Sequence, residues 1–109
     1  MAPLVSRPCG STALTGVTTQ GVNGVVAIPD SSTTPFIAPT QVKIYVSAKA
    51  YVAFGDGATA DTSPPARKVI QQAATEEVYV LTGIVDDLLD HVWIYSLSST
   101  IDADVSFFG

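Results

Sequence analysis

The sequence has one cysteine and no long apolar run, and each shortage excludes a class of protein. Cys9 has no second cysteine for an internal disulfide and cannot hold a structural zinc ion alone. No run of about 18 or more apolar residues is present, so we expect no membrane-spanning helix. The N-terminal stretch lacks both a basic leader and a long apolar segment, so we expect no secretory signal. These shortages predict a protein that folds where it is made.

Charge is also scarce. Only 14% of the 109 residues are charged, below the ~25% that is usual for globular domains. Five Lys and Arg stand against ten Asp and Glu, and residues 76–109 contain seven acidic residues and no basic one. Phosphate backbones are bound by clustered Lys and Arg, so this composition argues against a nucleic-acid partner. The acidic end could attract a basic partner, although an ordinary solvated acidic face is the simpler interpretation.

The chain also lacks the residue combinations of enzymes. With one His, one Cys and no nucleophile motif, neither a catalytic triad nor an oriented acid–base pair can be assembled. We therefore predict a non-enzymatic protein that needs no cofactor. The densest group of potential metal ligands contains Asp86, Asp87, Asp90 and His91. A capped turn with solvent-facing Asp explains this group, so we expect a metal there only if a neighbouring subunit adds ligands.

What the sequence does contain is a series of short β-prone segments between turn residues. Residues 41–47 alternate apolar and polar side chains with the period of a half-buried strand. The other strand-like segments are residues 24–29, 51–55, 67–73, 76–83, 91–97 and 102–108. About seven or eight short strands, spaced roughly every 10 residues, are typical of sandwiches and small barrels. We predict an all-β fold, either an antiparallel β-sandwich or a jelly-roll-like barrel.

The ends and connections of the chain have a different composition. Residues 1–23 are rich in Gly, Ser and Thr and show no sustained period, so we predict an irregular N-terminal arm. Residues 24–109 then form a single β-sandwich domain. The loop at residues 56–66 contains Asp-Gly and Pro-Pro, which are turn residues, and we expect it to reverse the chain first and touch a partner second. Residues 84–91 are predicted to form a single helical turn or a wide turn.

Several of the predicted strands are apolar on both faces. In residues 91–97, Trp93 and Tyr95 point to one side and Val92 and Ile94 to the other. A chain of this length cannot easily cover both faces of several strands, so we expect a homo-oligomer, with a trimer as the first guess, or docking on a larger surface. The candidate partner-contact residues are Phe36, Ile37, Tyr79, Trp93, Tyr95, Phe107 and Phe108.

Two stretches carry a family resemblance: "AKAYVAFGDGATAD" and the closing "VWIYSLSSTIDADVSFFG". Residues 41–109 are similar to small structural proteins encoded in the head-gene modules of tailed bacteriophages. The resemblance implies a β-sandwich or jelly-roll protein of the virion, made in the host cytoplasm, that decorates or cements the capsid by binding between major capsid subunits. It carries over no catalytic residue. The "DDLLDH" turn and the N-terminal third fall outside the pattern.

Two other functions remain open from the sequence. The first is a carbohydrate-binding or receptor-binding module that uses an aromatic side chain such as Tyr45, Tyr51 or Trp93 as a platform. The second is a head-to-tail joining or tail component, which predicts a ring of six or twelve copies instead of a small oligomer.

Overall fold

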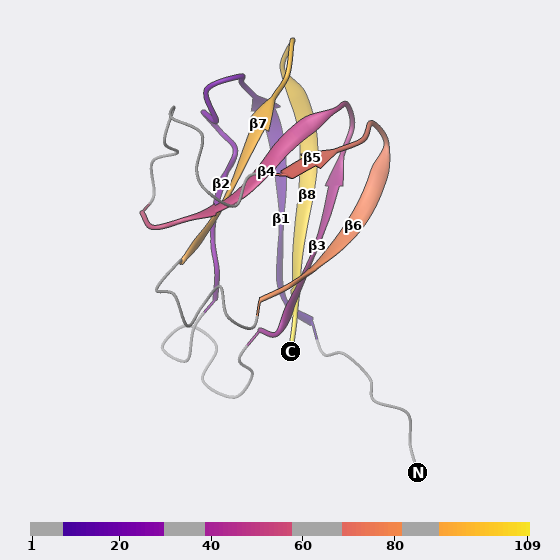
Figure 1. The fold of residues 1–109 in the computed structure, drawn as a ribbon. Helices are drawn as coiled ribbons and strands as arrows, with labels where there is room; N and C mark the ends of the chain where they lie inside the picture. Colours follow the sequence, from indigo (N-terminus) through magenta and orange to yellow (C-terminus); the bar gives the residue numbers. More distant parts are fainter. Residues whose placement is uncertain (1–7, 30–38, 58–68, 82–89) are drawn as a thin grey trace.

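The chain forms eight antiparallel strands and no helix in the residues that the computed structural model describes, which are 8–29, 39–57, 69–81 and 90–109 (Figure 1). None of these ranges therefore holds a helix that could cross a membrane. The strands are β1 (Pro8–Val17), β2 (Val25–Ala27), β3 (Gln41–Val46), β4 (Ala50–Gly55), β5 (Val69–Gln71), β6 (Thr75–Val80), β7 (His91–Ser96) and β8 (Ile101–Phe108).

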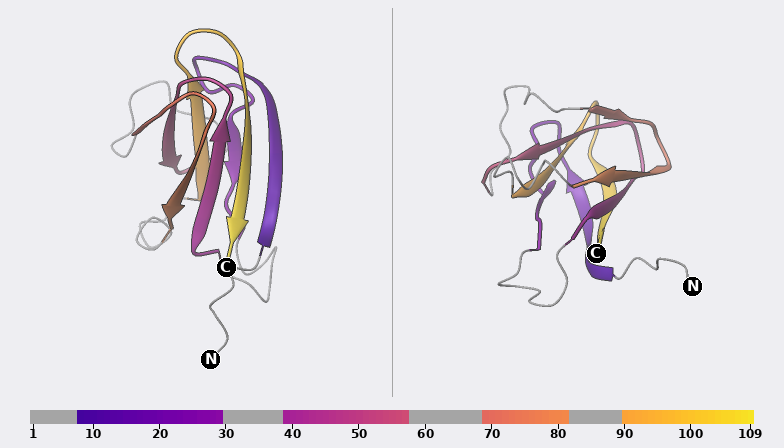
Figure 2. Two further views of the ribbon diagram at one scale, coloured as in Figure 1. Left: turned by 90° about the vertical axis from the view of Figure 1, so that its right-hand side faces the viewer. Right: turned by 60° about the horizontal axis from the view of Figure 1, so that its bottom comes forward.

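The strands form two four-stranded sheets that pack face to face (Figure 2). Their orders are β1-β8-β3-β6 and β2-β7-β4-β5. Pairing is nested, because β1 pairs with β8, β2 with β7, β3 with β6 and β4 with β5, all antiparallel. This is the strand order of a jelly roll. In the described ranges the edge strands of one sheet do not pair with those of the other, so the fold is an open sandwich and not a closed barrel. The predicted all-β antiparallel sandwich is confirmed.

The core lies between the two sheets and follows the alternation of the sequence. On β3 the side chains of Val42, Ile44 and Val46 are fully buried, as the pattern in residues 41–47 predicts. The facing strands add their own alternate residues, among them Val52 and Ile94. Burying each such side chain contributes roughly 1.5–3 kcal/mol, so this layer of aliphatic residues is the main source of stability.

The prediction of an irregular arm over residues 1–23 is wrong for Pro8–Val17, which form β1 and pair with β8 along almost its whole length. The sequence did not reveal this strand because its alternation of apolar and polar residues is interrupted. The pairing shifts register between Leu14 and Val17, and Gly16 adopts a positive φ of 66°. Leu14 and Val17 are both buried although they are three residues apart, so no period of two was visible. Residues 1–7 lie outside the described ranges.

A buried glutamine fixes the corner where the chain passes from β5 to β6, which lie in different sheets. The Gln71 amide nitrogen donates to the backbone oxygens of Ile44 (2.7 Å) and Thr75 (3.0 Å), and its oxygen accepts from the Tyr79 hydroxyl (2.9 Å). Every polar atom of this amide group has a partner, which is the usual condition for burying one. The corner holds β6 at the edge of its sheet.

Candidate binding surfaces

The outer face of the β2-β7-β4-β5 sheet carries an aromatic cluster. Trp93 and Tyr95 on β7 are buried there with Ala53 of β4, and Val25 and Tyr51 pack at the margin. The ring of Trp93 lies against Gly55, where any Cβ atom would overlap the indole. Residues 92–96 are buried on both faces within one chain, so these two faces do not provide the subunit interface that we expected from them.

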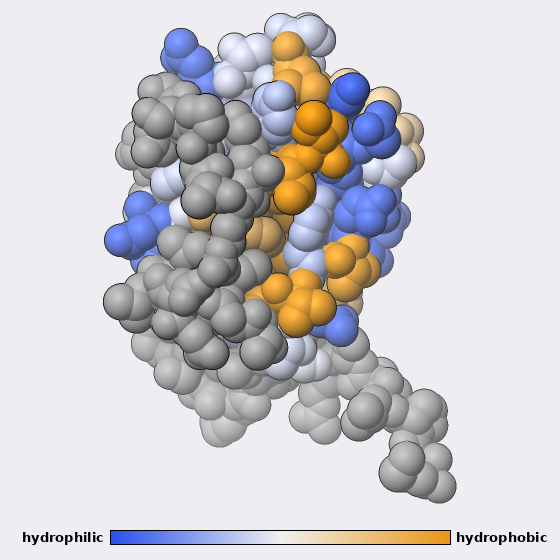
Figure 3. Space-filling model, in the orientation of Figure 1, coloured by the Kyte–Doolittle hydropathy of each residue, from blue (hydrophilic) through white to orange (hydrophobic). Residues whose placement is uncertain are grey.

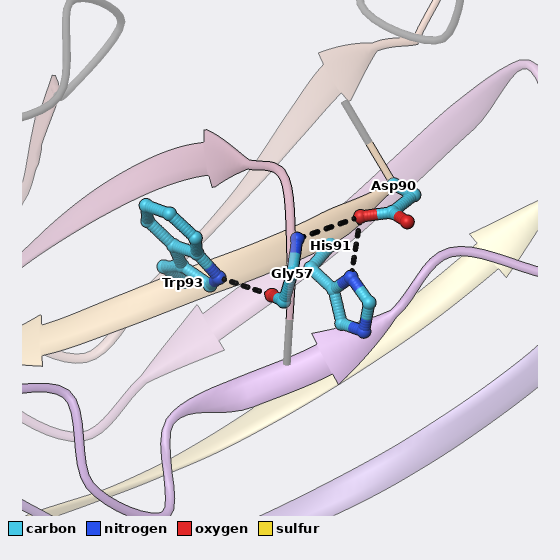
Figure 4. Close-up of polar contacts among 4 residues, drawn as sticks. All are labelled: Gly57, Asp90, His91 and Trp93. Atoms are coloured by element: carbon cyan, nitrogen blue, oxygen red, sulfur yellow. Dashed lines mark hydrogen bonds and ion pairs between the residues drawn. The ribbon is translucent and has the colours of Figure 1, made fainter. Parts of the chain in front are cut away.

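A polar network joins the end of β4 to the start of β7 (Figure 4). The Trp93 indole N–H donates to the Gly57 carbonyl (3.0 Å), and the Gly57 N–H donates to the Asp90 carboxylate (3.0 Å). The same carboxylate oxygen lies 2.6 Å from Nδ1 of His91. The Gly57 N–H, and after it the His91 side chain, hold the pKa of Asp90 below its ordinary value. These contacts give Asp90 a structural role that links two strands.

Two of the four predicted metal ligands lie in the described ranges. Asp86 and Asp87 lie outside the described ranges, whereas Asp90 and His91 bind each other. Among the residues whose placement is described, no three His, Cys, Asp or Glu side chains are arranged to hold a metal ion.

The predicted partner-contact residues are dispersed over the fold. Phe36 and Ile37 lie outside the described residues, and Trp93 and Tyr95 belong to the aromatic cluster. Phe107 is buried between the sheets, because its position on β8 faces inward next to Val42.

Tyr79 and Phe108 are half-buried and lie at different places on the β1-β8-β3-β6 sheet. Tyr79 points inward and meets the Phe54 ring edge-on, with 5.9 Å between centroids. Burial, and to a smaller extent the charge of Glu77, raises the pKa of Tyr79. Phe108 lies on the outer face, where the Lys43 ammonium is 5.6 Å from the ring centroid. The five predicted residues that lie in the described ranges therefore do not form one surface.

Exposed apolar side chains gather instead on the edge strands β5 and β6. Val69 and Ile70 on β5 are 43% and 49% exposed, and Val78 and Val80 on β6 are 57% and 60% exposed. Orange surface over these strands is visible in Figure 3. We call these four residues the apolar edge. In the sequence of residues 76–81, Val78 and Val80 alternate with the apolar Tyr79 and Leu81, but nothing there distinguishes them from the aromatic residues as contact residues.

The outer face of the β1-β8-β3-β6 sheet is hollowed into a shallow depression with a volume of about 500 Å³. All four strands contribute to it, and we call it the sheet depression. Its lining residues are Ser11, Thr12, Ala13, Lys43, Tyr45, Glu76, Asp104 and Ser106. Of the three aromatic platforms considered from the sequence, Trp93 is buried and Tyr51 packs beside it, whereas Tyr45 lines this depression.

The fold alone does not identify a function. Jelly rolls occur in viral capsid proteins and in lectins, and unrelated activities recur on the same architecture. The apolar edge and the sheet depression are therefore judged by their own chemistry. No protein-family model matches the chain, and neither the comparison with curated proteins nor that with solved structures gives a match.

Proposed function

We propose that this chain is a non-enzymatic bacteriophage structural protein that decorates or cements a capsid shell by binding between major capsid subunits. The observation that supports it best is the apolar edge, four half-exposed aliphatic side chains on two edge strands. Edge strands offer unpaired backbone groups, and exposed apolar side chains beside them favour a protein partner. The resemblance of residues 41–109 to phage head proteins points to the class of that partner.

The energy available at the apolar edge suits a contact that is weak singly and strong in many copies. Covering the exposed half of one Val or Ile contributes roughly 1 kcal/mol, so the four residues together contribute about 4 kcal/mol. That amount alone corresponds to a dissociation constant on the order of 1 mM. Repetition over many symmetry-related positions, or an oligomer that engages several at once, raises the effective affinity by orders of magnitude.

The proposal is tested by sedimenting purified capsid shells of the phage that encodes this chain with the purified protein. Wild-type protein should pellet with the shells at a saturating, fixed ratio. The double variant Val78→Lys/Val80→Lys places two strongly hydrated charges in the contact and should lose at least tenfold in affinity, about 1.4 kcal/mol or more.

A matched control is Val22→Lys, since Val22 is 57% exposed, the same fraction as Val78, but lies in the turn between β1 and β2. This variant should bind shells like wild type. A protein that never binds shells, or a double variant that binds as well as wild type, contradicts the proposal.

The same preparation tests one alternative that the sequence left open, the head-to-tail joining or tail component. Light scattering during gel filtration gives the molar mass in solution. A trimer or another small closed oligomer agrees with shell decoration, whereas a ring of six or twelve copies that leaves shells unbound favours a head-to-tail joining or tail component.

A further inference from the structure

We propose that the sheet depression is a binding site for a short, uncharged oligosaccharide. Its volume of about 500 Å³ lies within the ~300–1,000 Å³ of pockets that take small organic ligands. The site borders the apolar edge, because Val78 pairs with Lys43, but Val78 and Val80 do not line it and it does not depend on the proposed function.

The strand register brings the lining residues together in two neighbouring rows across the sheet. One row runs from β1 to β3 and contains Ser11, Ser106 and Lys43; the next runs from β1 to β6 and contains Ala13, Asp104, Tyr45 and Glu76. Residues two apart on a strand share a face, so both rows lie on the outer side. Small side chains on β1 leave space beside the larger side chains of β3. The result is a trough with a Tyr ring and hydroxyl and carboxylate groups at its surface.

A ligand over the middle of this trough meets mainly side chains. Both β8 and β3 are central strands and are paired on each side, so their backbone groups are already used. A peptide that binds by extending a sheet needs a free edge, and the middle of the trough, over β8 and β3, has none. The ligand must instead complement hydroxyls, one carboxylate and one aromatic ring.

An oligosaccharide has this complementary chemistry. Its many hydroxyl groups each donate and accept, the Asp104 carboxylate accepts only, and the Ser11 and Ser106 hydroxyls do both. The flat apolar face of a sugar ring fits the ring of Tyr45, whose phenol adds a polar end. A purely apolar ligand would leave most of these groups unpartnered.

The charges of the trough select an uncharged ligand. The Lys43 ammonium lies 3.4 Å from the Glu76 carboxylate, and this pair is close to neutral as a unit. Asp104 then gives the trough a net negative charge, which disfavours phosphorylated, sulfated or sialylated ligands. A basic peptide is the competing ligand on charge alone, and the test includes it.

The polar groups of the trough are free to bind. In the described parts of the chain, the side chains of Ser11, Tyr45, Asp104 and Ser106 make no hydrogen bond or ion pair to protein, whereas the buried polar side chains of the fold are all partnered. A ligand therefore displaces water and breaks no internal contact. Strands β3 and β8 also hold the groups in place before binding, which lowers the entropic cost of association.

The proposal is tested by incubating the full chain with an array of immobilised oligosaccharides. Uncharged glucans, mannans, galactans and chitooligosaccharides form the main set, with sialylated and sulfated members and lysine-rich peptides as charged comparators. The strongest uncharged oligosaccharide is then measured free in solution by titration calorimetry. We expect Tyr45→Ala and Asp104→Ala each to weaken binding at least tenfold.

Two further variants separate loss of the site from loss of the fold. Tyr45→Phe keeps the ring and should lower the affinity by no more than about threefold, which is less than a neutral hydrogen bond usually contributes. Asp56→Ala removes an exposed Asp that follows β4 and does not line the trough, so it should bind like wild type. Asp104 and Asp56 are exposed, so their alanine variants should melt within about 3 °C of wild type, whereas Tyr45→Ala removes a half-buried ring and Tyr45→Phe keeps it.

Three outcomes overturn the proposal: no uncharged oligosaccharide binds, only charged glycans or lysine-rich peptides bind, or binding is the same in Tyr45→Ala and Asp104→Ala as in wild type. None of them affects the shell-binding proposal, because Val78 and Val80 are not lining residues of the trough.

Discussion

Replacing Gly55 by alanine should destabilise the fold, although this change has the opposite effect at many positions. Where the backbone accepts it, Gly→Ala stabilises a protein by ~0.4–1 kcal/mol, because it restricts the unfolded chain. Gly55 ends β4 and is not among the glycines with positive φ, so the backbone itself permits alanine. The obstacle is the side chain of Trp93, because an added Cβ would overlap three atoms of the indole.

The size of the effect follows from what the indole must do to make room. Overpacking costs ~1–3 kcal/mol, and a displaced ring that loses its 3.0 Å hydrogen bond to Gly57 costs about 1 kcal/mol more. Restricting the unfolded chain offsets ~0.4–1 kcal/mol of this cost, so we expect the free energy of unfolding to fall by about 2.5 kcal/mol. A typical domain has a total of only ~5–15 kcal/mol. At ~4–8 °C per kcal/mol, the melting temperature should fall by about 10–20 °C.

Urea unfolding measured by circular dichroism and by fluorescence checks this prediction, since Trp93 is the only tryptophan and reports on its own surroundings. A double-mutant cycle identifies the cause. In a Trp93→Leu background the overlap is removed, so Gly55→Ala should become neutral or stabilising by ~0.4–1 kcal/mol. If Gly55→Ala leaves the otherwise unchanged protein as stable as before, or costs the same in both backgrounds, the steric argument is refuted.

Three other predictions concern polar side chains. Gln71→Leu removes the buried amide that donates to the Ile44 and Thr75 carbonyls and accepts from the Tyr79 hydroxyl, and should cost about 2–4 kcal/mol in urea unfolding. Gln72→Leu at the exposed next position should change stability by less than about 0.5 kcal/mol. The pKa of Asp90 is lowered in the folded state, so the contribution of Asp90 to the free energy of unfolding is present above the ordinary value of 3.8 and is lost as the pH falls below it. Asp90→Asn should therefore flatten this part of the acid unfolding curve. The pKa of Tyr79 is raised in the folded state, so the contribution of Tyr79 to the free energy of unfolding is present below pH 10.0, its ordinary pKa, and is lost at higher pH. Tyr79→Phe should reduce this alkaline loss of stability, measured by thermal melting across that pH range.

Most of the strand pattern could be predicted from the sequence, because alternation and turn residues are local signals. The segments at 41–47, 91–97 and 102–108 coincide closely with β3, β7 and β8. The strand β1 could not be found in this way, since its bulge and its Gly, Ser and Thr residues remove the apolar period. Its stability comes from pairing with β8, which is distant in the sequence.

The candidate sites were harder to predict, because each is assembled by tertiary structure. Only the register of four strands brings Ala13, Asp104, Tyr45 and Glu76 into one row, and no spacing in the sequence shows this. The aromatic residues were visible, but the sequence does not show that Trp93 packs against Gly55 and is buried with Ala53 and Tyr95. Large apolar side chains mark the core more often than they mark a contact surface.

The nested pairing of the strands has a consequence for how the chain folds during synthesis. Strand β8 lies between β1 and β3, so that sheet cannot be completed until almost the whole described sequence has left the ribosome. Until then β1 has no neighbour and β3 has a free side, and such edges attract other unfolded chains. The long sequence separation of the paired strands also predicts slow folding. A nascent chain that stalls before Ile101 should therefore be the form most prone to aggregate.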